Sequence, residues 1–133
     1  LENLGKTQLA YSPNILAGSA LMFVPSTHFQ IGFLSKFVGK QYMGNINSEN
    51  SSLPSYFISD INAVFLWQPK KWVKEIQWST TINNIFNLKY LSNGYFYTYD
   101  DDWTSPGQTT TIEGAGYYPQ AGLHFLSGLK LIF

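Results

Sequence analysis

The fold is decided by residues 73–87, which read VKEIQWSTTINNIFN. Apolar and polar side chains alternate along this stretch. The apolar side holds Ile76, Trp78, Ile82 and Phe86. The polar side holds Glu75, Gln77, Ser79, Thr81 and Asn83. Because successive side chains of a β-strand point to opposite faces, the stretch predicts a strand with one apolar and one polar face.

The same alternation recurs in four more segments, at about Asn14–Val24, His28–Tyr42, Ser55–Gln68 and Gly122–Phe133. The connections between the five segments are in turn short, long, short and long. Residues 25–27 and 69–71 are short turns, whereas residues 43–54 and 88–120 are long loops, the second of about thirty residues. This order is typical of an all-β, antiparallel up-and-down sheet whose two ends face different surroundings.

The composition excludes several classes of protein. Among 133 residues, 8 basic side chains, all of them lysine, balance 8 acidic ones, and there is no cysteine. A nucleic-acid partner requires a basic face, so we expect none. Without cysteine there is no disulfide and no thiolate metal site. Charged residues make up only 12% of the chain, whereas about 25% is usual for soluble domains.

The apolar face of the predicted sheet has two possible surroundings, lipid or a protein core. The predicted strands have about 11 to 15 residues, whereas soluble strands usually have about 5 to 6. A tilted membrane-spanning strand needs about 9 to 11. The alternative is a soluble barrel such as a lipocalin-like cup, but its outer face would carry more charge. We therefore expect the apolar face to meet lipid.

Five strands cannot close a membrane barrel, for which about eight is the minimum. We expect this sheet to belong to a larger wall whose other strands lie upstream. A chain that starts at Leu1, without an initiator methionine, agrees with that expectation.

Four motifs, taken in order, resemble the carboxyl-terminal end of TonB-dependent outer-membrane receptors. They are GKQYMGN at 39–45, TTINNIFNLKY at 80–90, YYPQAG at 117–122 and FLSGLKLIF at 125–133. The resemblance implies a barrel of about 22 strands with a plug in its lumen. Residues 1–133 would supply the last five strands, while the plug and the earlier strands are absent.

The resemblance also implies a function and a set of partners. Such receptors import a scarce nutrient, such as an iron chelate or similar small ligand, across the outer membrane of Gram-negative cells. The implied partners are the plug and upstream strands of the same receptor, the TonB complex, the barrel-assembly machinery, outer-membrane lipid and a surface lipoprotein. No cofactor and no enzymatic activity are expected.

Two groups of residues follow from the predicted strands. The residues expected to line the lumen and face the plug are Lys36, Asp60, Asn62, Gln77, Thr81, Asn83, His124 and Lys130. The residues expected to form an assembly signal, read by the barrel-assembly machinery, are Phe125, Gly128, Leu129, Leu131 and Phe133. The alternative for the second group is a lipid-facing strand that ends in phenylalanine without being a signal.

The ligand-binding candidates lie in the loop at 88–120. They are Tyr95, Tyr97, Tyr99, Asp100, Asp102 and Trp103. Aromatic side chains on an outer loop suit a chelate or a sugar ring. The alternative is a hairpin stabilised by cross-strand aromatic pairs, which the alternation of the tyrosines fits equally well.

No catalytic or metal motif is present. The three aspartates at 100–102 fail the EF-hand spacing, and there is no zinc-protease or serine-hydrolase signature. The two histidines, His28 and His124, fall on polar faces of separate strands, where a structural role is expected. A second hypothesis is that the chain is a barrel fragment acting as a client or interaction partner of the barrel-assembly machinery.

Overall fold

The computed structural model describes residues 5–69 and 72–133, and all of its sheets are antiparallel. The chain divides into two compact units. The first, the loop unit, comprises the described residues up to Leu16 together with Val38–Tyr56 and Tyr90–Gln120. The second, the sheet unit, comprises Ala17–Phe37, Phe57–Lys89 and Ala121–Phe133. Within the described residues, no helix is long and apolar enough to cross a membrane.

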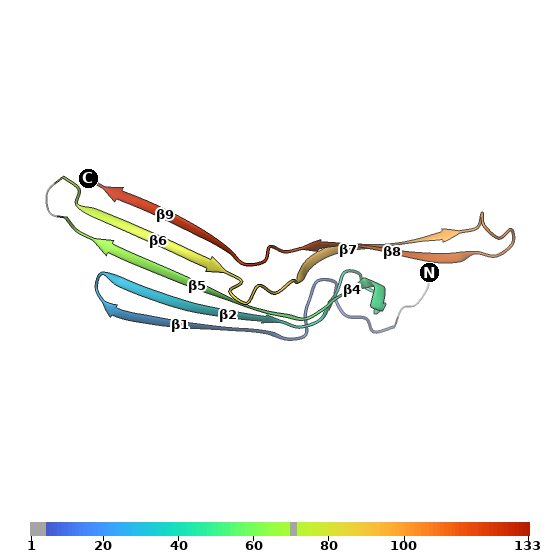
Figure 1. Ribbon diagram of the computed structural model, residues 1–133. Coiled ribbons are helices and arrows are strands. Elements are labelled where there is room, and N and C mark those ends of the chain that lie inside the picture. Colours follow the sequence, from blue (N-terminus) through green and yellow to red (C-terminus); the bar gives the residue numbers. More distant parts are fainter. Residues whose placement is uncertain (1–4, 70–71) are drawn as a thin grey trace. The chain divides into compact units, whose positions relative to one another are not determined.

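The sheet unit is built on one five-stranded antiparallel sheet with the order β1-β2-β5-β6-β9 (Figure 1). Its strands are β1 (Leu16–Ser26), β2 (Phe29–Val38), β5 (Tyr56–Trp67), β6 (Glu75–Asn83) and β9 (His124–Ile132). The five alternating segments of the sequence therefore form the five strands of one sheet, and the predicted all-β, antiparallel fold is confirmed.

Two strands end earlier than predicted. The second ends at Val38 instead of Tyr42, and the next residue, Gly39, donates its N–H to the Ile15 carbonyl (2.8 Å). The fourth ends at Asn83 instead of Asn87, because Asn84 adopts a positive φ of 51° that interrupts the extended backbone. Lys70 and Lys71 of the predicted turn at 69–71, and the start at Leu1, lie outside the described residues.

The loop unit contains two small sheets. The first pairs β3 (Gln41–Tyr42) with β4 (Ser52–Leu53), which follows a short 3₁₀ turn, η1 (Glu49–Ser51). The second is a long hairpin of β7 (Leu91–Asp101) and β8 (Thr110–Pro119). Residues 88–120 are therefore not an irregular loop throughout, and the hairpin that was the alternative interpretation of this segment is confirmed.

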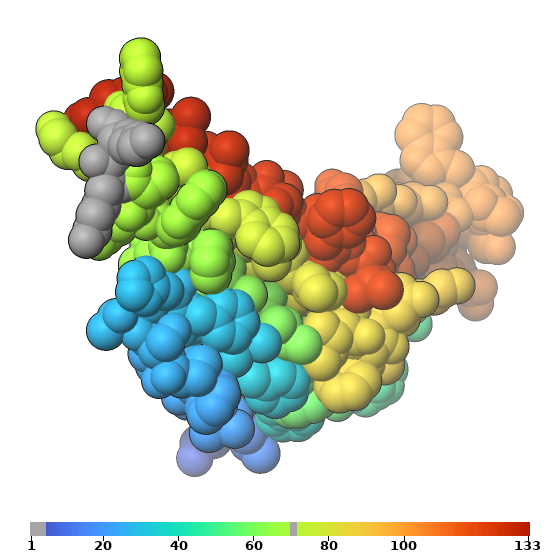
Figure 2. All heavy atoms as spheres, turned by 60° about the vertical axis from the view of Figure 1, so that its left-hand side comes forward, coloured from blue at the N-terminus to red at the C-terminus, as the bar shows by residue number. Residues whose placement is uncertain are grey.

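Buried apolar side chains are few. Among the described residues they are Val38, Met43 and Leu53, all in the loop unit. The sheet unit instead exposes its large apolar side chains, for example Phe125 (75%), Leu129 (65%) and Trp78 (51%). Figure 2 shows β1 and β2 in blue beside β5 in green, with no other part of the described sheet unit lying over them. The sheet therefore has no hydrophobic core of its own on its apolar face.

Candidate functional site

The apolar residues of β5, β6 and β9 form continuous rows across the sheet. Phe65 is paired with Trp78, which is paired in turn with Leu129. A second row joins Ile61, Ile82 and Phe125, and a third joins Trp67, Ile76 and Leu131. The strand register therefore gathers the predicted apolar residues of three strands on one surface, which we call the apolar face.

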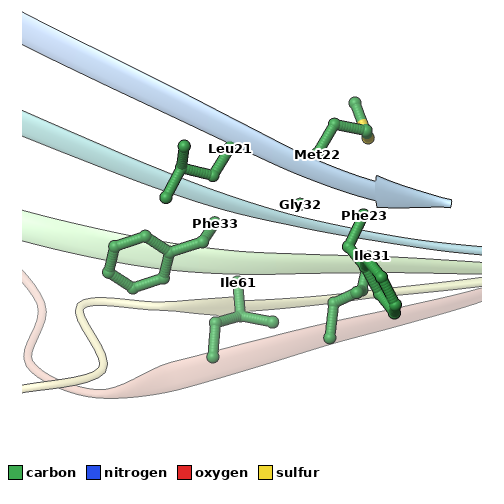
Figure 3. Close-up of a pocket in the computed structure, with 7 residues that line it drawn as sticks. All are labelled: Leu21, Met22, Phe23, Ile31, Gly32, Phe33 and Ile61. Atoms are coloured by element: carbon green, nitrogen blue, oxygen red, sulfur yellow. The ribbon is translucent and has the colours of Figure 1, made fainter.

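The apolar face continues over β1 and β2. Leu21 and Phe23 of β1, Ile31 and Phe33 of β2 and Ile61 of β5 point to the same side, whereas Met22 points to the other (Figure 3). Together with Gly32 these residues line a shallow apolar hollow of about 220 Å³. The predicted alternation of side chains is thus confirmed for β1 and for β2 at this point of the sheet.

Three hydrogen bonds from polar side chains of the apolar face are made within the sheet. The indole Nε1 of Trp78 donates to the Ser127 hydroxyl (2.7 Å). The Thr80 hydroxyl donates to the Leu126 carbonyl (3.1 Å). Ser35 and Ser59, which lie on this side by alternation, share a hydroxyl hydrogen bond of 2.8 Å. These three bonds join β6 to β9 and β2 to β5.

The predicted lumen-facing residues lie on the opposite, polar face. Asn62 donates from Nδ2 to the hydroxyl of Thr81, its strand partner (2.9 Å). Gln77 is the strand partner of Lys130, and Asn83 is the partner of His124. Lys36 is exposed on β2 and lies on the same side by alternation. Apolar residues that the prediction did not include, Val64, Leu66 and Leu126, interrupt this face.

Asn84 forms the corner at which β6 ends. Its side chain is buried and uses both of its polar atoms: Nδ2 donates to the carbonyls of Leu88 (2.8 Å) and Ala121 (3.2 Å), and Oδ1 accepts from Leu88 N (3.0 Å). Its backbone N–H donates to the Asp60 carboxylate (2.8 Å). Asn84 thus holds together the end of β6, strand β5 and the segment before β9.

The residues of the predicted assembly signal all lie on or beside β9. Phe125, Leu129 and Leu131 belong to the apolar face, and Gly128 is paired with Ser79 on the polar face. Phe133 follows the last strand residue, Ile132. One side of β9 pairs with β6, and its other side meets no strand of the described chain. β9 is therefore an edge strand.

The tyrosines of β7 form an ordered surface on one side of the hairpin. The rings of Tyr95 and Tyr97 are 6.3 Å apart and nearly parallel, and those of Tyr97 and Tyr99 are 6.4 Å apart. Tyr118 of β8 lies against Tyr95, with ring centroids 6.1 Å apart. We call these four side chains the tyrosine face.

Glycines on β8 make room for the tyrosine rings. Gly116 is paired with Tyr95, and Gly114 is paired with Tyr97. A Cβ atom on Gly114 would clash with Cζ of Tyr97, and one on Gly116 would clash with Cε1 of Tyr95. The rings therefore lie over the neighbouring strand, a known way of covering glycine in a sheet.

The other side of the hairpin is held by the segment between β3 and β4. The Glu113 carboxylate accepts hydrogen bonds from the Ser48 hydroxyl (2.9 Å) and from Nδ2 of Asn50 (2.8 Å). The Tyr117 hydroxyl donates to the Asn50 carbonyl (3.2 Å). In addition, the Tyr11 hydroxyl donates to the Gly94 carbonyl (2.8 Å). The hairpin is thus fixed on one side, whereas Tyr95, Tyr97 and Tyr99 on its other side are about half exposed in the described part of the chain.

The other ligand-binding candidates are not on the tyrosine face. Asp100 lies on the opposite side of the hairpin, where it accepts a hydrogen bond from Thr111 (2.8 Å). Asp102 and Trp103 lie at the tip, and Trp103 is 87% exposed. The structure therefore brings together the three predicted tyrosines and separates them from Asp100, Asp102 and Trp103.

Asp101 organises the tip of the hairpin and was not among the predicted residues. Its carboxylate accepts from the Trp103 and Thr104 N–H groups (3.0 and 3.3 Å) and from the Thr104 hydroxyl (2.6 Å). The Thr104 hydroxyl, followed by the two N–H groups, lowers the pKa of Asp101 below its usual value. Asp101 is followed closely by Thr104, Ser105 and Gly107. Such a cluster is a turn signal, which could have indicated the role of Asp101.

Tyr118 was also missed, and so was the function of Gly114 and Gly116. The alternation of Gly114 and Gly116 opposite alternating tyrosines is the signal that could have found them.

Over residues 5–69 and 72–133, no three His, Asp or Glu side chains cluster closely enough to hold a metal ion. Comparisons of the chain with protein-family models, curated proteins and solved structures found no match.

Proposed function

We propose that this chain is the carboxyl-terminal part of the barrel wall of a TonB-dependent outer-membrane receptor that imports a scarce nutrient. The observation that carries the proposal is the apolar face. It extends over all five strands, it includes exposed large side chains such as Trp78 and Phe125, and its Trp78, Thr80 and Ser35 side chains hydrogen-bond within the sheet. A surface with these properties suits lipid, where unpaired polar groups cost several kcal/mol each.

The two edges of the sheet support the same proposal. β1 and β9 lie at opposite edges, and an open edge in lipid would leave backbone groups without partners. Further strands of the receptor would pair with both edges and close the barrel. The polar face, with the Asn62–Thr81 hydrogen bond and Lys130, would then line the lumen and meet the plug. The β7–β8 hairpin would belong to an outer loop.

The experiment is to fractionate cells that produce the full-length protein containing this chain. The proposal predicts recovery in the outer membrane, resistance to carbonate extraction and a mobility on gels that changes on heating. It also predicts that nutrient uptake through the protein stops when the TonB complex is removed. Recovery of the folded protein in the aqueous fraction would contradict the membrane claim, and uptake that continues without TonB would contradict the transport claim.

A second candidate is favoured by the edge position of β9. A free strand edge with alternating apolar residues such as Phe125 and Leu129 could pair with a strand of the barrel-assembly machinery. On this candidate the chain is a client or interaction partner of the machinery. Cross-linking at Gly128 distinguishes the two, because a receptor contacts the machinery only during assembly, whereas a lasting partner remains cross-linked in mature membranes.

A further inference from the structure

The tyrosine face has the dimensions of a platform for several rings in a row. Tyr95, Tyr97 and Tyr99 follow one another at 6.3 and 6.4 Å, with interplanar angles of 16° and 15°. The first and third rings are therefore separated by about twice the distance between neighbours. Each of the three side chains is about half exposed, at 50%, 52% and 51%. A ligand that covers this row must be longer than one ring.

The chemistry of the tyrosine face is aromatic and hydroxylic. A phenol ring offers an apolar surface for stacking and a hydroxyl group that both donates and accepts hydrogen bonds. Sugar rings combine the same two properties, because one face of a pyranose is lined with C–H bonds and its rim carries hydroxyl groups. Tyrosine is therefore complementary to a sugar in both respects.

The charge of the hairpin argues against an anionic ligand. Residues 91–119 contain no lysine and no arginine, but four acidic residues, Asp100, Asp101, Asp102 and Glu113. An iron chelate with carboxylate or catecholate groups would be repelled here.

The hydrogen bonds of these acids also argue against a cation on the platform. Asp100 and Glu113 are bonded on the opposite side of the hairpin, to Thr111 and to Ser48 and Asn50. Asp101 follows the tyrosine row on the same side of β7 by alternation, and its carboxylate accepts three hydrogen bonds from Trp103 and Thr104 at the tip. The four tyrosines thus form an uncharged surface, which suits a neutral ligand.

The platform is also held in place before any ligand arrives. The hydrogen bonds to Glu113 and from Tyr117 fix the opposite side of the hairpin. The glycines at 114 and 116 let the rings lie over β8 without displacing its backbone. A platform with little freedom to lose on binding gains affinity for that reason.

We propose that the tyrosine face binds a neutral oligosaccharide along the row Tyr95, Tyr97 and Tyr99. This inference rests on the proposed function, because it names the class of cargo that the receptor would take up. The sugar rings stack on the phenol rings, and the phenol hydroxyl groups bond to the sugar hydroxyls. No covalent step is involved.

The test is binding by the full-length protein that carries this chain, purified from whichever cell fraction holds it. The probes are maltohexaose, cellohexaose, xylohexaose and mannohexaose, with ferric citrate as an anionic probe and spermidine as a cationic one. The variants are Tyr97→Leu, which keeps apolar bulk over Gly114, and Tyr97→Phe, which keeps the ring. Trp72→Leu, at an exposed aromatic residue of the sheet unit, is the matched control.

The expected result is that at least one hexasaccharide binds. Tyr97→Leu should weaken its binding about three- to tenfold, whereas Trp72→Leu should leave it unchanged and Tyr97→Phe should lie between the two. Failure of all four hexasaccharides to bind would overturn the proposal. So would an unchanged affinity in Tyr97→Leu, or binding of ferric citrate or spermidine that depends on Tyr97. The fraction from which the protein is recovered tests the proposed function separately.

Discussion

The indole Nε1 of Trp78 donates a 2.7 Å hydrogen bond to the Ser127 hydroxyl, which joins β6 to β9 on the apolar face of the sheet. In water such a bond would compete with solvent at both ends. In the lipid of the proposed setting neither group would have another partner, and the bond would then account for the serine among Phe125, Leu129 and Leu131.

The first prediction concerns this bond. Ser127→Ala leaves the Trp78 indole N–H without its partner, and we expect a loss of about 1 kcal/mol in the free energy of unfolding in lipid vesicles. Urea titration followed by tryptophan fluorescence measures it. The control is Ser127→Ala in a Trp78→Phe background, where the serine has lost its partner and the loss should be smaller. Equal losses in both backgrounds would show that the bond contributes nothing.

The second prediction concerns the corner at Asn84. Asn84→Ala removes three side-chain hydrogen bonds. It also leaves alanine at a φ of 51°, which strains the backbone without an amide side chain to offset the strain. We expect a loss of about 2–4 kcal/mol in the free energy of unfolding. Asn84→Gly loses the same bonds but tolerates positive φ, so its loss should be smaller by about 1 kcal/mol. An alanine variant as stable as the glycine variant would contradict the role of the left-handed backbone.

The third prediction concerns the glycines beneath the tyrosine face. Gly114→Ala places a methyl carbon where the Tyr97 ring lies, so we expect the ring to move and its near-ultraviolet circular dichroism to weaken. Gly18→Ala is the matched control, because its added carbon would lie an ordinary 3.7 Å from the Ser35 carbonyl oxygen. A spectrum that changes equally in both variants would contradict the packing of Tyr97 on Gly114.

The fourth prediction concerns pH and the tip of the hairpin. Because hydrogen bonds from Thr104 and from the Trp103 N–H lower the pKa of Asp101 in the folded protein, the charged carboxylate favours the folded tip. This contribution is present above the unfolded-state pKa, about 3.9, and is lost as the pH falls through the lower, folded-state pKa. Carbon NMR of the Asp101 carboxyl group measures the titration. Thr104→Val should raise the midpoint, and an unchanged midpoint would contradict the assigned cause.

The strands of the sheet could be predicted because most of their side chains alternate between apolar and polar. From Glu75 to Asn83 the only exception is Thr80, which lies on the apolar side, and the register of β5, β6 and β9 agrees with the alternation. The end of β6 could not be predicted from alternation. It depends on the positive φ of Asn84, which is stabilised by contacts with Asp60 and Ala121, far away in the sequence.

The candidate binding site could be predicted only in part. The alternation of Tyr95, Tyr97 and Tyr99 indicated a common side, and the structure has it. The strand opposite them was missed because β8 is rich in glycine and threonine and lacks an apolar alternation of its own. Asp100 and Asp102 were included for their proximity in sequence, but alternation puts Asp100 on the far side from the tyrosines.

The central claim is that the apolar face meets lipid, and cysteine scanning along β6 tests it most directly. Residues 1–133 contain no cysteine, and any cysteine elsewhere in the full-length protein is first replaced by serine, so that a single cysteine at each position from 76 to 82 carries the spin label. The measurement compares collisions with oxygen, which dissolves in lipid, and with a water-soluble nickel complex, in the full-length protein in membranes. We predict high oxygen accessibility at positions 76, 78, 80 and 82 and low accessibility at 77, 79 and 81. High accessibility to the nickel complex at positions 76, 78, 80 and 82 would contradict the account.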